Sequence, residues 1–446
     1  MALIRLPEWG RAEASGLTRS ERELLAEAIS AWKEANGLPF APLAFEGPNG
    51  NTLAARQYVG VIETDTVAVE IYPKLDKGLS DEEEVSPDQA QSVLKSLLWV
   101  LEASGYEELV ETGEGGLKES PESFPDLFAL LLGQRLRAEL ERGVPRSYMP
   151  QEDDLKAVRG RLLVGRQATQ NYERWDRLAC AFDEFTPDIT LGQILRCACR
   201  ELQTRVRHPE ARRLLTDCLG LLDEVSDITV PEALYKASVL PPWSRAWDRF
   251  RRPYTLAVRL LRGLSHELRA ASADTFVFLL DMNRVFESFV TAAIEARFGV
   301  PVQAQKDLGR LLKLGAGGIR QLADSYWVAR DGAIWIGDAK YKHLAAGQAD
   351  ALTFAKDETA PAGRFLSPDD IRQLTVYAEL TRARIGGAPP TLALFYPFVG
   401  TGAFNIDSAE AWNGSRLYIV PVRLSRELGL NHALPENLIE AICKTK

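Results

Sequence analysis

Two aspartates and a lysine stand close together in the stretch LADSYWVARDGAIWIGDAKYK, Leu322 to Lys342. Asp324 and Asp338 lie in two apolar, β-rich runs that predict neighbouring strands, and Lys340 follows Asp338 by two positions. Because side chains alternate along a strand, Asp338 and Lys340 share one face, whereas Ala339 points away. The pattern places charged groups of both signs at the end of one strand.

The connection between the two runs fixes how they pair. Arg330, Asp331 and Gly332 suit a three-residue hairpin loop, with a type I turn and Gly332 in the left-handed conformation. That loop pairs the residues on either side of it, and counting outward places Asp324 opposite Asp338. The Cβ atoms of the two aspartates are then roughly 5 Å apart.

Two carboxylates at that separation repel each other unless a cation lies between them or one takes up a proton. Oxygen ligands at this density suit Mg²⁺ or Mn²⁺, which also bind substrate phosphates. Lys340 can then orient an attacking water or neutralise charge that develops on phosphorus. The pattern therefore indicates hydrolysis of phosphodiester bonds.

The alternative is a solvent-exposed edge that carries acids and a lysine without function, because D-x-K is a short motif that arises by chance. The second strand, however, is apolar on both faces, with Ile334 and Ile336 on one side and Trp335 and Tyr341 on the other. Such a strand is typical of a sheet interior. Charged residues that end an interior strand favour the functional interpretation.

The elements around this hairpin predict an α/β module. The pattern changes near Ala271 to a long buried helix. The predicted order is then helix, strand, strand, helix, strand, with the later elements at Asp324–Ala329, Ala333–Tyr341, Pro368–Arg384 and Thr391–Tyr396.

The beginning of the chain has a mixed pattern. Thr18 and Glu21 form a capping-box signature ahead of a helix that ends near Gly37. The expected elements after it are a hairpin, a loop, a helix and a connector, at Gln57–Glu63 with Thr66–Tyr72, Asp76–Asp88, Gln91–Ser104 and Glu111–Pro125.

The middle of the chain, from Asp126 to about Ala270, is chiefly helical in pattern, and a polar stretch at Val144–Arg174 interrupts it. We therefore predict an α/β, multidomain α+β protein. Its expected domains are a mixed α+β N-terminal domain over 1–125, a mainly helical region over 126–270, and the α/β module with the two aspartates and the lysine over 271–446.

Composition supports a globular protein outside membranes. The 446 residues are 46% hydrophobic and 26% charged, and the length suggests about three domains. No apolar run approaches the roughly 18 residues that a membrane span needs. Five cysteines without a CxxC pair favour a reducing cytoplasm and core positions, and they disfavour a zinc site.

The net charge of −9 hides a gradient along the chain. Residues 62–126 hold 17 acidic residues and 4 lysines, whereas residues 245–269 hold 7 arginines and 2 acidic residues. This asymmetry is consistent with an acidic N-terminal part that binds a protein and a basic middle region that binds a polyanion. Solvated helix faces would account for it equally well.

The motifs together resemble the PD-(D/E)xK nucleases, and within them the McrC family of McrBC modification-dependent restriction systems. The resemblance runs from about Tyr58 to Pro397. It rests on YVGVIETDTVAVEIYPKL, RGVPRSYMPQEDDLKAVRGRL, DMNRVFESFV, the central hairpin, Gln373-x-x-x-Tyr377 and LALFYP. Ala323 stands where the motif usually has proline, a residue that shapes the backbone and supplies no ligand.

The resemblance implies a role for each matching residue. Asp324 and Asp338 would bind the metal together with the main-chain carbonyl of Ala339, and Lys340 would be the catalytic lysine. Three further residues would support them. Glu287 would complete or support the metal shell, and Gln373 and Tyr377 would hold the active site or the DNA backbone. Two purely structural alternatives stay open: Glu287 as a solvated helix residue and Tyr377 as a core residue.

The resemblance also implies a function. It predicts a Mg²⁺-dependent endonuclease subunit, with Mn²⁺ as a second candidate metal, that cuts double-stranded DNA containing 5-methylcytosine. A McrB-like hexameric AAA+ GTPase would be its partner, and the N-terminal part would dock on that partner and stimulate it. The rivals are a non-catalytic activator or adaptor of the motor and a stand-alone RecB-like repair exonuclease.

Overall fold

The structure is a computed structural model that describes most of the chain. The described residues are 2–47, 50–75, 85–104, 121–174, 176–240, 243, 245–264, 275–311, 319–341, 368–398, 404–411, 413–426 and 429–438. The chain divides into two units, of which the first contains 1–124 and 271–446 and the second contains 125–270. Most of the predicted loop Asp76–Asp88 and connector Glu111–Pro125 lies outside the described residues.

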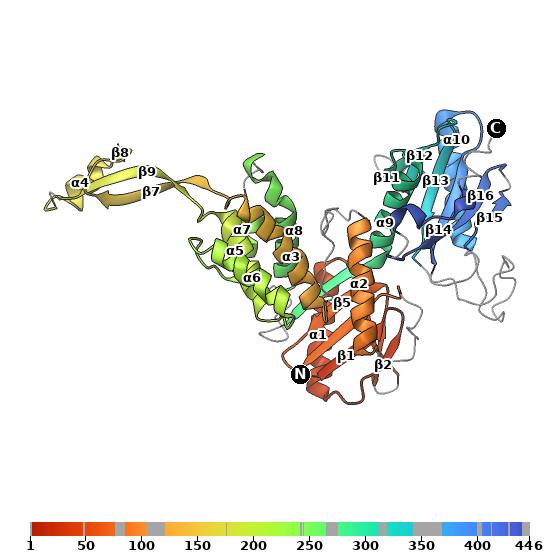
Figure 1. Cartoon of the computed structure of the whole chain (residues 1–446), viewed down its shortest axis with the longest axis horizontal. Coiled ribbons are helices and arrows are strands. Elements are labelled where there is room, and N and C mark those ends of the chain that lie inside the picture. Colours follow the sequence, from red (N-terminus) through yellow and green to blue (C-terminus); the bar gives the residue numbers. More distant parts are fainter. Residues whose placement is uncertain are drawn as a thin grey trace. The chain divides into compact units, whose positions relative to one another are not determined.

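The first unit begins with a sheet in the order β1-β6-β5-β10 (Figure 1). Its strands are β1 (Ala2–Pro7), β5 (Tyr58–Glu63), β6 (Val67–Tyr72) and β10 (Phe276–Asp281). β5 and β6 form the predicted hairpin, and β1 runs parallel to β6. A second sheet has the order β2-β4-β3, with β2 (Arg11–Glu13), β3 (Leu43–Glu46) and β4 (Thr52–Ala55).

Two capped helices accompany these sheets. α1 (Arg19–Ala35) begins after Thr18, which makes both hydrogen bonds of the predicted capping box with Glu21. α2 (Pro87–Ala103) has an equivalent box at Ser86, so it begins earlier than the predicted Gln91. The caps satisfy amide groups that the first helical turn leaves without partners.

The predicted site lies in a six-stranded sheet of the order β11-β12-β13-β14-β16-β15. Its strands are β11 (Gln303–Arg310), β12 (Arg320–Val328), β13 (Ile334–Ala339), β14 (Thr391–Phe398), β15 (Asp407–Glu410) and β16 (Arg416–Arg423). The helices α9 (Met282–Phe298) and α10 (Pro368–Ile385) both contact β13, and a short 3₁₀ helix covers Leu430–His432. α9, β12, β13, α10 and β14 occur in the predicted order of helix, strand, strand, helix, strand, but the structure adds β11 between α9 and β12, a strand that the prediction lacks.

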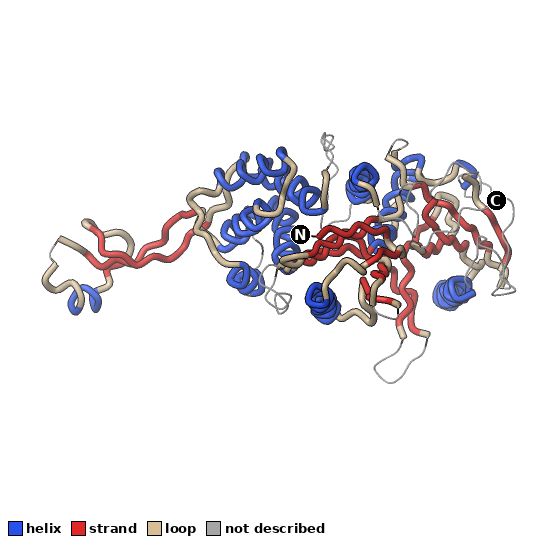
Figure 2. The backbone as a smooth tube through the Cα atoms, turned by 90° about the horizontal axis from the view of Figure 1, so that it is seen from below, coloured by secondary structure: helices blue, strands red, loops and turns tan. Residues whose placement is uncertain are grey.

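The two faces of this sheet are packed differently. Leu374 and Tyr377 of α10 pack on Ile336 and Leu394, which point from the sheet toward that helix. Elsewhere in the sheet, the Trp335 ring stacks between Trp327, at a centroid distance of 5.4 Å, and Tyr418, at 5.3 Å. Figure 2 shows helices on both sides of the strands in the first unit, as an interior strand such as β13 requires.

The described residues before α9 form a strand rather than the beginning of the predicted long helix. Phe276–Asp281 is the strand β10, which pairs antiparallel with β5, and α9 begins only at Met282. Phe276, Val277 and Phe278 are aromatic or β-branched residues that favour a buried strand over a helix. Through β10 the third predicted domain shares a sheet with the first, and 1–124 and 271–446 therefore fall in one unit.

The second unit contains five longer helices among its described residues, as the pattern predicts. They are α3 (Phe124–Glu141), α5 (Thr190–Gln203), α6 (Pro209–Leu221), α7 (Val230–Ser238) and α8 (Arg251–Arg262), with the short α4 (Val164–Thr169) and a 3₁₀ turn at Arg245–Phe250. Cys197, Cys199 and Cys218 are buried free thiols in this helical part. Cys180 is also buried and free, whereas Cys443 lies outside the described residues.

The polar stretch in the middle region contains strands that the chiefly helical prediction missed. β7 (Ser147–Leu155), β8 (Arg161–Leu162) and β9 (Leu178–Thr186) form a sheet in the order β7-β9-β8. Most of β7 is exposed on both faces, so its sequence lacks the alternation of polar and apolar residues that marks a half-buried strand. Figure 1 shows β7 and β9 as a narrow ladder.

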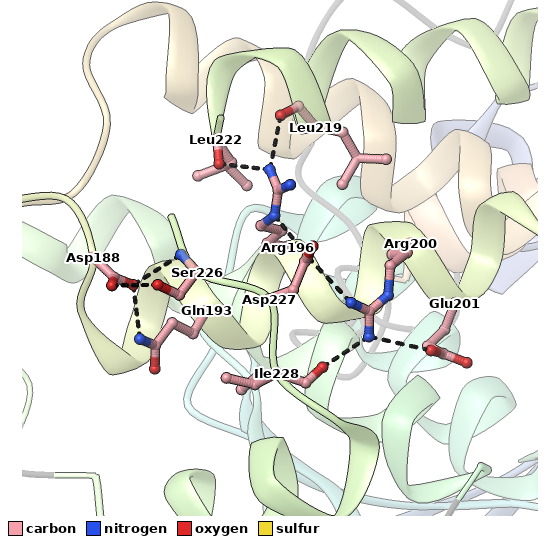
Figure 3. A network of polar contacts seen from close by, with 10 residues as sticks. All are labelled: Asp188, Gln193, Arg196, Arg200, Glu201, Leu219, Leu222, Ser226, Asp227 and Ile228. Atoms are coloured by element: carbon pink, nitrogen blue, oxygen red, sulfur yellow. Dashed lines mark hydrogen bonds and ion pairs between the residues drawn. The ribbon is translucent and has the colours of Figure 1, made fainter. Parts of the chain in front are cut away.

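Arginines of α5 tie the loop after α6 to the helices (Figure 3). Arg196 donates to the carbonyl of Leu222 at 2.7 Å and to Asp227 at 2.8 Å, and Arg200 donates to the carbonyl of Ile228 at 2.8 Å. These arginines donate to main-chain carbonyls between the end of α6 and the beginning of α7. Their charge therefore has a structural role.

No helix in the described ranges is both long and apolar enough to cross a bilayer.

Gly60 permits the close approach of β5 to β10. Its φ is +144°, and an added Cβ would lie 2.0 Å from the carbonyl oxygen of Phe278. We expect Gly60→Ala to lower the free energy of unfolding by roughly 1–3 kcal/mol, because the two strands must separate. Gly16→Ala is the control, since nothing lies within 4 Å of its added Cβ. Equal thermal unfolding midpoints for the two variants would contradict this account.

Candidate active site

The hairpin of β12 and β13 has the register that the sequence predicts. Ala329 accepts from Gly332 and donates to Ala333, and Gly332 has a φ of +86°. Tyr326 lies opposite Ile336, and Ser325 lies opposite Gly337. Asp324 and Asp338 follow this last pair by one position, so both carboxylates belong to the same end of the hairpin.

The Asp324 carboxylate is held by donors on both sides. Its Oδ2 accepts from the backbone amide of Ala339 at 2.9 Å, and its Oδ1 accepts from Gln305 Nε2 at 3.1 Å. The same amide group of Gln305 donates to Glu287 Oε2 at 3.0 Å. Glu287 on α9 is partly buried and reaches Asp324 through Gln305, whereas a part in metal binding stays a prediction.

Lys340 is the cationic member of the site. Its Nζ lies 2.7 Å from Asp338 Oδ2 and donates to Gln373 Oε1 at 3.2 Å. Gln373 Nε2 donates to the hydroxyl of Tyr377, which donates to the carbonyl of Leu322 at 2.7 Å. This run of hydrogen bonds fixes which end of the Gln373 amide faces the lysine. Tyr377 is thus buried in the core and also linked to the site.

Burial and mutual repulsion raise the pKa values of the acids. Burial first, and then the charges of Asp324, Asp281 and Asp338, raise the pKa of Glu287 to about 7. Burial and the Asp324 charge raise the pKa of Asp338 to about 7, although Lys340 opposes the shift. Burial also raises the pKa of Asp324.

The lysine responds in the opposite way. Burial alone would lower the pKa of Lys340, but Asp338 and Asp324 raise it overall. Lys340 is therefore a protonated ammonium group at neutral pH, and it can donate hydrogen bonds but cannot act as a base in that form.

The donor set fits a hard divalent cation. Asp338 is 1% exposed, and its Oδ1 has no hydrogen-bond partner, so a charged oxygen is buried without a donor. Such an orphaned oxygen is costly unless a cation or proton meets it. Within the described residues no group of three or more His, Cys, Asp or Glu side chains stands as a ready metal cluster. The groups that would hold the cation are the carboxylates of Asp324 and Asp338 and, as the resemblance implies, the main-chain carbonyl of Ala339.

The segment that follows β13 and carries Lys340 is hydrogen-bonded to the N-terminal part of the chain. Tyr341, the next residue, donates its hydroxyl to Glu8 Oε1 at 2.6 Å, across 333 positions of sequence. Glu8 Oε1 also accepts from the backbone amide of Lys74 at 2.7 Å. Glu8 thus links the residue after Lys340 to the N-terminal segment of the first unit.

Sequence reasoning missed two residues near the site. Gln305 lies in β11, whose sequence QAQKDLGR has no strand pattern, so no local signal points to it. Asp370 lies three residues before Gln373 on α10, accepts from Tyr396 at 3.3 Å, and contributes to the raised pKa of Asp338. Helical spacing from Gln373 could have indicated Asp370.

Several residues in and beside the basic stretch 245–269 contact their own unit. Phe250 is fully buried, and Trp243 and Tyr254 contact each other with ring centroids 5.1 Å apart. Arg251 pairs with Asp248 at 3.0 Å, and Arg249 donates to the carbonyl of Gly143. Phe250 is therefore a core residue. Contact of the basic stretch 245–269 with a polyanion such as DNA stays a prediction.

Comparisons with known proteins agree with the sequence motifs. The family described as McrBC 5-methylcytosine restriction system component matches residues 53–397. A chain of the solved half-complex of Thermococcus gammatolerans McrB AAA+ hexamers with bound McrC is 18% identical, with 94% of each chain covered and a TM-score of 0.67. A chain of the cryo-EM structure of the Thermococcus gammatolerans McrBC complex is 21% identical, with 66% of this chain and 87% of that chain covered and a TM-score of 0.49. No curated protein matches the chain.

The raised pKa of Asp338 predicts how stability depends on pH in metal-free protein. An unfolded aspartate ionises near pH 4, whereas folded Asp338 does so at about 7. The folded state therefore holds the proton more tightly, so ionisation costs stability as pH rises between these values. The unfolding midpoint of Asp338→Asn, relative to wild type, should be higher at about pH 8 than at about pH 5 in the presence of a chelator.

The matched control is Asp65→Asn, which changes an exposed aspartate outside the site. Its difference from wild type should be the same at both pH values. A pH-independent difference for Asp338→Asn would show that the buried carboxylate does not titrate as described.

Proposed function

Because the chain belongs to the McrBC 5-methylcytosine restriction system component family, we propose that it is a McrC-type nuclease subunit that cuts double-stranded DNA. The six-stranded sheet with α9 and α10 would be its PD-(D/E)xK domain. The single observation that carries the proposal is the pair of opposed acids, Asp324 and Asp338, with Lys340 2.7 Å from Asp338. Its substrate would be DNA that contains 5-methylcytosine.

The residues divide the chemistry among them. Asp324, Asp338 and the carbonyl of Ala339 would hold Mg²⁺ or Mn²⁺, with Glu287 in support. The bound cation would supply a Lewis acid for phosphodiester hydrolysis. Lys340, held as an ammonium group by its raised pKa, would orient the attacking water and donate to the phosphate oxygen that gains charge. Gln373 and Tyr377 would keep Lys340 in place for that step.

The partner of the proposed nuclease is a McrB-like hexameric AAA+ GTPase. The solved assembly with the shared fold contains McrB AAA+ hexamers with bound McrC, and the fold match covers 94% of this chain. We propose that this chain binds such a hexamer, stimulates its GTP hydrolysis and receives DNA that the partner has selected. The rival adaptor function would keep the stimulation and lack the cleavage.

Removing the charges at the site separates these functions. We expect Asp338→Ala and Lys340→Ala to lower Mg²⁺-dependent cleavage of methylated DNA by the assembled complex by roughly 100-fold or more, because charge stabilisation of the reacting phosphate is lost. GTP hydrolysis by the partner should remain stimulated. Cleavage is measured on linear methylated and unmethylated DNA, and stimulation is measured as phosphate release.

Asp369→Ala is the matched control, because Asp369 lies on α10 with its side chain 84% exposed. It should leave cleavage unchanged. Cleavage that survives in Asp338→Ala would favour the adaptor. Short products from the chain alone, without the motor, would favour the stand-alone exonuclease.

Tyr377→Phe tests the hydrogen bonds that hold the lysine. The hydroxyl accepts from Gln373 and donates to Leu322, so its loss frees the amide that faces Lys340. We expect kcat to fall by roughly 10-fold, with KM for DNA nearly unchanged, because Lys340 loses its orientation for the chemical step. An increase in KM at constant kcat would instead assign Tyr377 to DNA binding.

A further inference from the structure

Gln305 has a backbone conformation that its residue type disfavours. Its φ is +50°, and Trp9 is the other non-glycine residue with positive φ in the described part of the chain. On either side of it, Ala304 pairs with Ser325 and Lys306 pairs with Ala323. Gln305 therefore faces Asp324 at an interruption of the ladder between β11 and β12. Such a conformation persists only where the surroundings hold it, and it clusters at functional sites.

The conformation places one amide group between two acids. Gln305 Nε2 donates to Asp324 Oδ1 at 3.1 Å and to Glu287 Oε2 at 3.0 Å. The other oxygen of Asp324 accepts from the amide of Ala339 at 2.9 Å. Two donors on opposite neighbouring strands, β11 and β13, thus fix the plane of the Asp324 carboxylate. Glu287 is fixed relative to it by the same amide group.

We propose that Gln305 is a positioning residue that prepares Asp324 and Glu287 to receive a divalent cation. Groups that hydrogen-bond to a ligating side chain orient it before the ion arrives. Each Asp324 oxygen keeps a lone pair for the ion while the donors hold the carboxylate. The inference rests on the proposed function and deepens it, because it concerns the affinity of the same site for its cation.

The backbone conformation makes a clean test available. Glycine adopts a φ near +50° without steric cost, so Gln305→Gly should fold with an unfolding midpoint equal to or above that of wild type. Gln305→Met keeps the length of the side chain but removes the amide group. We expect both variants of the full chain to bind Mn²⁺ roughly 10 to 100 times more weakly than wild type. Affinity is measured without DNA, by isothermal titration and by the electron paramagnetic resonance signal of free Mn²⁺.

Gln303→Met is the matched control, because Gln303 lies in the same strand and its Oε1 accepts from Lys306 rather than contacting the acids. It should bind Mn²⁺ as wild type does. Asp338→Asn serves as the reference for loss of the site itself. A loss of affinity in Gln305→Gly without a loss of stability would distinguish positioning from a merely structural role.

The possible failures are distinguishable. If wild type binds Mn²⁺, Asp338→Asn weakens the binding and both Gln305 variants match or exceed wild type, the role of Gln305 is overturned and the proposed function stands. If wild type binds no Mn²⁺, or Asp338→Asn binds as wild type does, both the metal site and the role of Gln305 are overturned.

Discussion

The repulsion between Asp324 and Asp338 is the constraint around which the rest of the site is arranged. Burial at the end of an interior strand removes the water that would otherwise weaken it, so the pKa of Asp338 rises despite the ammonium group of Lys340. The surrounding hydrogen-bond donors offset this repulsion only in part, because no donor reaches Asp338 Oδ1. A buried arrangement of this kind is unfavourable for folding alone, and it becomes intelligible when a cation completes it.

The two helices that contact β13 serve different parts of this arrangement. α10 contributes its packing face to the core and, from the same side, the Gln373 and Tyr377 pair that fixes Lys340. α9 contributes Glu287, which reaches Asp324 through Gln305. Lys340 is therefore oriented from α10, and Asp324 is linked to α9 through Gln305. A displacement of one helix would disturb one half of the site and leave the hydrogen bonds of the other half in place.

The sequence predicts the parts of the site that depend on local pattern. The turn at Gly332 sets the register of the hairpin, and period-two alternation then places Asp338 and Lys340 on one face. The McrC resemblance adds Glu287, Gln373 and Tyr377, which the structure brings to the same place. Gln305 could not be found in this way, because its position depends on the pairing of β11 with β12 and on a backbone angle that no side-chain pattern reports. The pairing of β10 with β5 is not predicted for a similar reason, since the two strands are separated in the sequence by the whole second unit.

That pairing has a consequence for the order in which the chain is assembled at the ribosome. Synthesis delivers β5 first, then the entire second unit, and only then β10, so the edge of β5 stays uncovered while residues 125–270 emerge and fold. An uncovered strand edge invites pairing with other chains. The hydroxyl of Tyr341 can meet Glu8 only after β13 has also been synthesised. A nascent chain thus carries its N-terminal sheet unfinished until β10 has followed the whole second unit out of the exit tunnel.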